Sequence, residues 1–447
     1  MKKIRFSMLL ASVVVSGTVG AVELLEGAVT SKDPKVRDCR ILVAGDDERA
    51  SALRSVARML RGNGVPEDGL RTRTVAMHDL SNEWATLASE TKVRPTCLVY
   101  AGDDGDVARS LTRIYRELRQ QKVPAELHLT SGWGRTPEKR GQAPASAEAG
   151  ARVLEFLRQM EVVGKLGGPV SQSHRWMPGD TIRTEKEPLW PKGQIPDAAP
   201  NQGYDPYLVW FVPEKPTTKA IQIVFPGGGY NSCNFNGEGT PLAYWLNGKG
   251  MTCVVVMYRC PRAEGRPKHF CAWQDAQRAI RVVRVGAPAR GLDPNRIGIL
   301  GFSAGGHLTL VTATGARTPA YRPVDAIDQL PCTVQWACPI YPAYALAGDA
   351  GRANGKGDNA PDAAPAPELA FDADTPPMCF VHGDADVYSP MSSVVCWERL
   401  RRMGIPGDLH TLATRGHCFQ MAASPGTGSS TWADRLWEFL SRAGFNR

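Results

Sequence analysis

The stretch GFSAGG, residues Gly301–Gly306, decides the fold of this chain. It follows the β-rich run Arg296–Leu300 and precedes the helix-forming run His307–Val311. A G-x-S-x-G pattern between a strand and a helix is typical of a sharp turn that exposes the serine hydroxyl at a sheet edge. Such a turn strains the backbone of the serine, so small residues must flank it. The pattern therefore predicts that Ser303 is a nucleophile.

Two residues that a serine nucleophile requires lie downstream. Met378–Val381 is typical of a buried strand, which runs into a loop with Asp384 and Asp386, and His417 lies on a loop before the last expected helix. A serine hydroxyl needs a histidine to take its proton and a carboxylate to orient that histidine. We expect His417 to be the base and Asp386 to orient it. Asp384 is the alternative, and we expect it to tighten the turn instead.

A glycine-rich loop supplies the remaining part of the predicted site. Ile221–Phe225 is a strand-like run, and the segment PGGGY, Pro226–Tyr230, follows it. Loops of this kind place backbone N–H groups against the oxyanion of an acyl-transfer intermediate. We expect the donors to be Gly228 or Gly229 together with Ala304. No Gly-Lys-Ser/Thr follows, which argues against a phosphate-binding loop.

The other histidines have no catalytic pattern. His382 ends a strand-like run and His307 lies in the helix behind the serine, so we expect both to be structural, with His307 packed or hydrogen-bonded. His174 and His269 have no partner in the sequence.

Three charged residues are interpreted as holding the fold. We expect Asp275 to cap a helix start and Arg278 to tie that helix to a loop. Glu238 could cap a helix or line the pocket, and we favour the structural role.

These residues resemble the α/β-hydrolase superfamily, and within it the bacterial acetyl-esterase and acetylxylan-esterase-like group, close to the feruloyl-esterase-like and hormone-sensitive-lipase-like branches. Besides the nucleophile, aspartate and histidine segments, the resemblance rests on Phe225–Tyr230, Glu238–Asn247, Val254–Arg259, Asp275–Arg281 and Leu292–Gly298. The chain departs from the pattern at Pro226, where lipase-like relatives have histidine, and at Cys418, where glycine is more usual.

The resemblance implies an α/β fold with a doubly wound, mostly parallel sheet. It places Ser303, Asp386 and His417 at the family's triad positions and Gly228, Gly229 and Ala304 at its oxyanion positions. It further implies a serine esterase that removes acetyl groups from plant-polysaccharide fragments or similar small esters, with no metal and no cofactor. The alternatives are a serine peptidase of the prolyl-oligopeptidase type and a carbohydrate-binding relic without activity.

Composition and the N-terminus bound the setting of the protein. The chain is 43% hydrophobic and 22% charged, which is typical of a globular protein, and its 447 residues are enough for two domains. Residues 1–21 have the basic start, short apolar run and small-residue end of a secretory signal peptide, so we expect export to the periplasm or beyond, with no membrane anchor after cleavage. The net charge of +8 is scattered rather than clustered, so a nucleic-acid partner has no support.

The eleven cysteines do not indicate a metal site, because none forms a C-x-x-C pair. A disulfide among Cys233, Cys260 and Cys271 stays open at this point. Cys418 lies beside the predicted base, but it lacks the turn that Ser303 has, so we reject it as the nucleophile.

The N-terminal part of the chain contains a candidate repeat. Cys97–Asp104 and the following segment to Trp133 resemble Cys379–Asp384 and the segment to His417, but the histidine position falls at or near Trp133. We therefore expect residues 30–162 to form a small α/β module, related to a hydrolase C-terminal half and unable to catalyse. The alternative is that such strand–helix units are generic. Residues 163–188 are interpreted as a linker and residues 189–447 as the catalytic domain.

Overall fold

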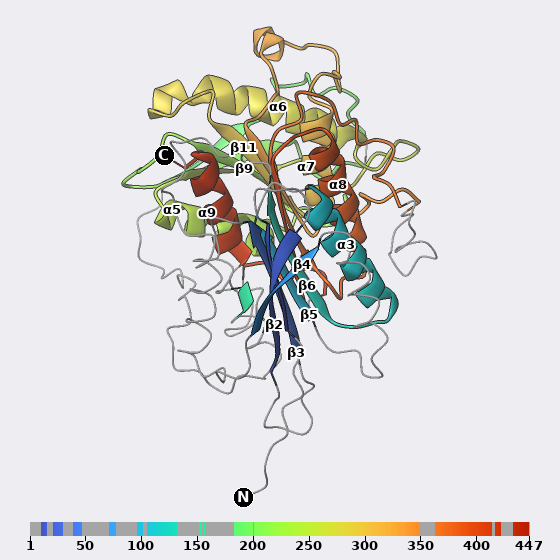
Figure 1. The fold of residues 1–447 in the computed structure, drawn as a ribbon. Coiled ribbons are helices and arrows are strands. Elements are labelled where there is room, and N and C mark those ends of the chain that lie inside the picture. The colour runs from blue at the N-terminus through green and yellow to red at the C-terminus, as the bar shows by residue number, and fades with distance from the viewer. Residues whose placement is uncertain are drawn as a thin grey trace, which may run out of the picture.

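The computed structural model gives a single mixed sheet with helices on both faces (Figure 1). The structure describes residues 10–15, 21–29, 39–46, 71–76, 96–101, 105–131, 183–199, 201–348, 363–413, 416–421 and 432–446, together with Arg152, Val153 and Phe156.

We call the part of the chain from Arg183 onward the catalytic half, because the sequence predicts the active site there. It contributes eight strands in the order β7-β8-β10-β9-β11-β12-β13-β14. The strands are β7 Arg183–Pro188, β8 Tyr207–Val212, β9 Ile221–Phe225, β10 Thr252–Met257, β11 Ile297–Phe302, β12 Trp336–Ile340, β13 Met378–Gly383 and β14 Gly407–Leu412. From β10 to β14 the neighbours are parallel, and β7 and β8 join antiparallel at one edge. The predicted α/β-hydrolase fold is therefore confirmed.

Helices cover both faces of this sheet, so its central strands are buried on both sides. On one face pack α3 Gly105–Gln120, α6 Phe270–Gly286, α7 Ala304–Thr314 and α8 Met391–Arg402. On the other face pack α5 Thr240–Gly248 and α9 Trp432–Ala443, on the left in Figure 1. Every residue of β9, β10 and β11 is buried, which explains why these strands are continuous apolar runs in the sequence.

The N-terminal strands extend the same sheet. They are β1 Leu10–Val15, β2 Ala21–Val29, β3 Cys39–Asp46, β4 Arg71–Ala76, β5 Thr96–Ala101 and β6 Ala125–Ser131. The expected module is joined to the catalytic half through β6, which pairs antiparallel with β14. Its helix α3 lies beside α8, to the right of the sheet in Figure 1.

The antiparallel pairing of β6 with β14 is symmetric about one pair of histidines. His128 pairs with His410, Leu127 with Thr411, and Leu129 with Leu409. The two histidines are 282 residues apart, and the same offset separates β5 from β13 and β6 from β14. A duplicated strand–helix–strand unit would produce this equal spacing, which supports the hypothesis of an internal repeat. The segment around Trp133 lies outside the described residues.

The linker prediction was wrong at its C-terminal end. Arg183–Pro188, inside the interpreted linker 163–188, forms β7 and pairs with β8. Its sequence RTEKEP is too polar to indicate a strand, but it lies at a sheet edge, where charged side chains are common. Trp210 and Arg290 bind its glutamates, Glu187 and Glu185, each at 2.8 Å.

The predicted leader stays a prediction. The structure places Leu10–Val15, inside residues 1–21, as strand β1 parallel to β3. Cleavage after Ala21 would remove this strand. Among the described residues, no helix combines the length and apolarity needed to span a bilayer.

Asp275 holds the fold, but not as a helix cap. It lies in the second turn of α6 and is completely buried. Its carboxylate accepts hydrogen bonds from the backbone N–H of Arg259 at 2.8 Å, from the Arg259 guanidinium at 2.9 Å and from the Trp190 indole at 2.8 Å. It therefore joins three segments. Arg278 ties the helix to a loop as expected, through Asp325 at 2.7 Å.

The buried ion pair gives a stability prediction. Replacing Asp275 with alanine leaves the Arg259 guanidinium buried without its carboxylate, which typically costs about 3–5 kcal/mol. We expect Asp275→Ala to lower the free energy of unfolding in urea by this amount. The control is Asp374→Ala, which removes an exposed ion pair with Arg317 and should change nothing measurable. Equal effects of the two substitutions would contradict the assignment.

Candidate active site

The site begins with the backbone of Ser303, which connects β11 to α7. Its φ is 53° and its ψ is −117°, a conformation that side-chain-bearing residues rarely adopt. Two backbone hydrogen bonds, each of 3.0 Å, hold this turn: Ser303 N–H donates to Ile340, and His307 N–H donates to the Ser303 carbonyl. The predicted strained turn is therefore present, and it aims the serine hydroxyl away from the sheet.

The structure brings the three predicted catalytic side chains into one line. The Ser303 Oγ lies 2.7 Å from His417 Nε2, and His417 Nδ1 lies 2.8 Å from Asp386 Oδ2. Asp386 comes from the loop after β13, and His417 from the segment after β14, so the carboxyl ends of adjacent strands supply both. The hydroxyl can give its proton to one ring nitrogen while the carboxylate fixes the other.

The electrostatics of this line favour a charged histidine. Burial opposes the imidazolium, but the contacts with Asp386 and with Cys418 together outweigh it and raise the pKa of His417 to about 9. Burial likewise opposes the Asp386 carboxylate, yet hydrogen bonds from His382 and His417 lower the pKa of Asp386 to about 2. The aspartate therefore stays ionised and stabilises the positive charge that the base acquires.

The glycine loop approaches the nucleophile closely. A β-carbon built on Gly227 would lie 2.9 Å from the Ser303 β-carbon, so no side chain fits there. Gly228 and Gly229 have φ of 133° and 65°. Within the described part of the chain, the N–H groups of Gly228, Gly229 and Ala304 have no acceptor in the protein. Ala304 directly follows the nucleophile and the two glycines follow Gly227, so these unpaired donors suit a developing oxyanion.

Glu238 positions this loop, a role that the sequence left open. It lies in the π-helical turn Phe235–Gly239 and is 1% exposed. Its carboxylate accepts a hydrogen bond from Gly227 N–H at 2.6 Å and another from the Tyr341 hydroxyl at 2.9 Å. Burial raises the pKa of Glu238, although these two hydrogen bonds oppose the rise. The Tyr341 ring also packs on His417, so Glu238 connects the glycine loop to the base.

The alternative aspartate lies elsewhere, and the role expected for it was wrong. Asp384 does not reach His417; its carboxylate accepts a hydrogen bond from Tyr115 at 2.6 Å and pairs with Arg119 at 2.8 Å. Both partners belong to α3, so Asp384 joins the catalytic half to the N-terminal module rather than tightening its own turn. Its side chain could not have been assigned from sequence, because its partners lie more than 260 residues away.

Two histidines that the sequence placed outside the site adjoin it. His382 is buried, contacts Ser393 at 2.8 Å and lies 3.4 Å from Asp386, so it is a structural residue beside the triad carboxylate. His307 is hydrogen-bonded, as expected, with Nδ1 2.8 Å from the hydroxyl of Tyr230. Tyr230 is the residue after the glycine run, and no sequence pattern links it to His307.

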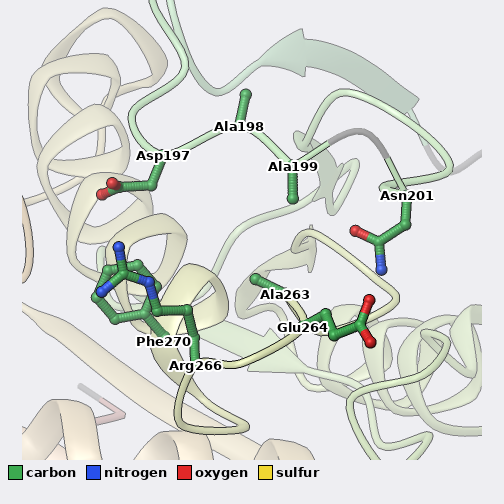
Figure 2. Close-up of a pocket in the computed structure, with 8 residues that line it drawn as sticks. All are labelled: Asp197, Ala198, Ala199, Asn201, Ala263, Glu264, Arg266 and Phe270. Carbon is green, nitrogen blue, oxygen red and sulfur yellow. The ribbon is translucent and has the colours of Figure 1, made fainter.

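A pocket of 460 Å³ lies on the loop before α6, and none of the three triad residues lines it. Figure 2 shows the Arg266 guanidinium stacked on the Phe270 ring, with Asp197 nearby and Asn201 and Glu264 across the opening. The same loop donates a hydrogen bond from Arg262 N–H to the Tyr230 carbonyl at 2.7 Å. The pocket therefore belongs to a segment that touches the glycine loop.

Comparisons with known proteins relate this chain to esterases. Residues 210–330 match the family model described as BD-FAE. An acetylxylan esterase of Xylanibacter ruminicola is 39% identical over 107 residues, which are 24% of this chain and 21% of that protein. Esterase LipQ of Mycobacterium tuberculosis is 34% identical over 127 residues, 28% of this chain and 29% of its own length. The match therefore spans less than a third of either relative.

One solved structure is similar over the whole catalytic half. The crystal structure of an acetyl ester-xyloside bifunctional hydrolase from Caldicellulosiruptor lactoaceticus has a TM-score of 0.50 and 28% sequence identity, over 60% of this chain and 99% of that one. Together with the BD-FAE match, it confirms the resemblance to esterases of the α/β-hydrolase type.

The raised pKa of His417 gives a test of its contact with Asp386. The Asp386 carboxylate stabilises the imidazolium, so replacing it with the neutral amide in Asp386→Asn should lower the His417 pKa from about 9 toward its ordinary value. We expect an NMR titration of the histidine Cε1–H signals to show this fall, with His417→Gln identifying the signal. A midpoint that Asp386→Asn leaves unchanged would contradict the contact.

Proposed function

Since the chain has the α/β-hydrolase fold and resembles its esterases, we propose that it is a serine carboxylic-ester hydrolase that cleaves short-chain esters, acetyl esters first. The observation that carries this proposal is the line from Ser303 Oγ through His417 to Asp386, with contacts of 2.7 Å and 2.8 Å. Ala304, directly after the serine, and Gly228 and Gly229 of the glycine loop have backbone N–H groups without an acceptor among the described residues. A nucleophile, a base and an oxyanion site are what acyl transfer needs.

The first half of the proposed reaction forms an acyl-enzyme. The Ser303 oxygen attacks the ester carbonyl carbon while His417 Nε2 takes the hydroxyl proton. The carbonyl oxygen becomes an oxyanion held by the N–H groups of Ala304 and of Gly228 or Gly229, and each such donor is typically worth about 10²–10³ in rate. The intermediate collapses, the carbon–oxygen bond to the alcohol breaks, and His417 gives its proton to the leaving alkoxide.

The second half repeats these steps with water. His417 takes a proton from a water molecule, whose oxygen attacks the acyl carbon of the Ser303 ester. Collapse of this intermediate releases the carboxylic acid and returns the proton to the serine oxygen. Asp386 keeps its charge throughout and stabilises the imidazolium. These residues suffice for both halves of the reaction.

The choice of substrate rests on the relatives and on the crowded site. One named relative is an acetylxylan esterase, and the similar solved structure is an acetyl ester-xyloside hydrolase. Ser303 is only 7% exposed. The ring centroids of Tyr341 and Tyr388 lie 5.1 Å and 4.8 Å from the ring centroid of His417. A small acyl group suits this surrounding. We therefore propose acetylated plant polysaccharide or oligosaccharide as the substrate, reached after export through the leader 1–21.

Acetate release tests this proposal. We expect the wild-type chain to release acetate from acetylated xylan and from p-nitrophenyl acetate. Ser303→Ala removes the nucleophile and should lower kcat by about 10⁴-fold or more. The control is Asp374→Ala, which removes an exposed carboxylate paired with Arg317 and should stay active.

The outcomes separate the rivals. Release from the small ester alone would keep the mechanism and discard xylan. Faster Ser303-dependent turnover of dipeptidyl p-nitroanilides would indicate a peptidase of the prolyl-oligopeptidase type. No Ser303-dependent turnover of any of these substrates would leave the carbohydrate-binding relic.

Glu238 gives a second prediction for the same activity. Glu238→Ala frees the Gly227 N–H and the Tyr341 hydroxyl, so the oxyanion donors lose their fixed position. Because these donors stabilise the oxyanion, which develops in the transition state, we expect kcat to fall about 10²-fold with little change in KM. Steady-state kinetics on p-nitrophenyl acetate measure the split. A rise in KM at constant kcat would contradict a role in holding the loop.

A further inference from the structure

Three side chains from separate parts of the chain meet behind the glycine loop. His269 precedes α6, His307 lies in α7, and Glu368 follows the bridge at Pro365. His307 Nε2 is 3.2 Å from Glu368 Oε1, and the rings of His269 and His307 are 5.5 Å apart between centroids. One ligand atom from each residue lies within 4.8 Å of the other two. The sequence did not indicate this cluster, because its members share no local spacing.

The geometry points to a binding site for a divalent transition metal, Zn²⁺ above all, with His269, His307 and Glu368 as its protein ligands. Two imidazoles and one carboxylate are a ligand set that zinc uses where a fourth position stays open to water. Ligand atoms at about 2.0–2.1 Å around a tetrahedral ion stand about 3.3–3.4 Å apart. The 3.2 Å between His307 and Glu368 already matches this spacing, and a turn of the His269 ring would close the third side.

The surroundings of His307 orient it for this role. A metal-bound histidine typically holds its other ring nitrogen in a hydrogen bond, which fixes the ring. His307 Nδ1 lies 2.8 Å from the Tyr230 hydroxyl, so Nε2 faces Glu368 and the cluster. The Tyr344 ring packs against both His307 and Tyr230. The ring of His307 is therefore already set in one orientation.

Two other groups of metal-type ligands fit less well. Cys379, Asp408 and His410 lie close together, but Arg442 contacts Asp408 at 2.6 Å. Burial lowers the pKa of His410, and His128 and nearby guanidinium groups lower it further, so positive charge already occupies that surrounding. All three residues of that group are buried, and so are Cys97, Glu126 and His128, which form the other group, so neither group is open to an ion from solvent.

By contrast, His269 and Glu368 are both partly exposed. An ion and a coordinated water could therefore reach this cluster from solvent. The site does not depend on the proposed esterase activity. A bound ion would fasten the Glu368 segment to α7 and, through Tyr230, to the glycine loop.

The test uses the full-length protein after removal of metal with a chelator. We expect isothermal titration with Zn²⁺ to give one ion per chain and a higher Tm, which EDTA reverses. The Co²⁺ derivative should show visible bands of low coordination number without a thiolate-to-cobalt charge-transfer band. Such a band would place the ion at a cysteine thiolate and overturn the assignment.

Variants complete the test. His269→Ala and Glu368→Gln should each weaken Zn²⁺ binding by on the order of tenfold or more and reduce the Tm shift at a given Zn²⁺ concentration. Glu368→Gln keeps the shape of the side chain, so it remains informative if His269→Ala folds poorly. The matched control is Lys268→Met, which removes a cation next to the site and should bind Zn²⁺ at least as tightly as the wild type. Absence of stoichiometric binding, or equal binding by Glu368→Gln and wild type, would refute the site.

Discussion

The strained backbone of Ser303 is the constraint on which the rest of the catalytic half depends. A residue with φ of 53° and ψ of −117° persists only where its surroundings hold it. Here β11 is buried on both faces, α7 starts immediately after the serine, and the carbonyl of Ile340 holds its N–H. The sheet order, with β11 between β9 and β12, is what brings the glycine loop and the next strand end to the same place.

A second constraint is the close approach of two backbones. The glycine loop lies so near the turn that a β-carbon at Gly305 would come within 2.0 Å of the Phe225 carbonyl. Close packing of this kind fixes the site but leaves N–H groups unpaired. Glu238 satisfies one of them, Gly227 N–H. A buried carboxylate is costly unless it is hydrogen-bonded, so its two donors are part of the same arrangement.

Much of the catalytic half could be predicted from sequence because its signals are local. Buried parallel strands are continuous apolar runs, and Ile221–Phe225 forms β9 with the bounds expected for it. The turn at Ser303 needs small neighbours, and the glycine loop needs glycines. The order of serine, aspartate and histidine follows from strand order. Asp386 could be preferred over Asp384 because it lies farther beyond the strand end, at the loop tip expected to face His417, and it is the one that contacts His417.

What could not be predicted depends on long-range pairing. The partners of Asp384 come from α3, and the acceptor role of Asp275 comes from Arg259 and Trp190 rather than from its own helix. The polar edge strand β7 carries no apolar pattern, because only one of its edges is paired. In the sequence His307 is a single histidine within a helix, and its contact with Glu368 is visible only in the structure. In each case the sequence shows one partner and the fold supplies the other.

The most direct test of the account is labelling by a fluorophosphonate, with the site of the adduct found by mass spectrometry. The reagent reacts with a serine only where a base activates it and an oxyanion site holds the phosphoryl oxygen. We predict one adduct per chain, on Ser303, formed at least about 10²-fold more slowly in His417→Ala. No adduct on Ser303, or labelling at an equal rate in His417→Ala, would contradict the claim that these residues form a working nucleophile.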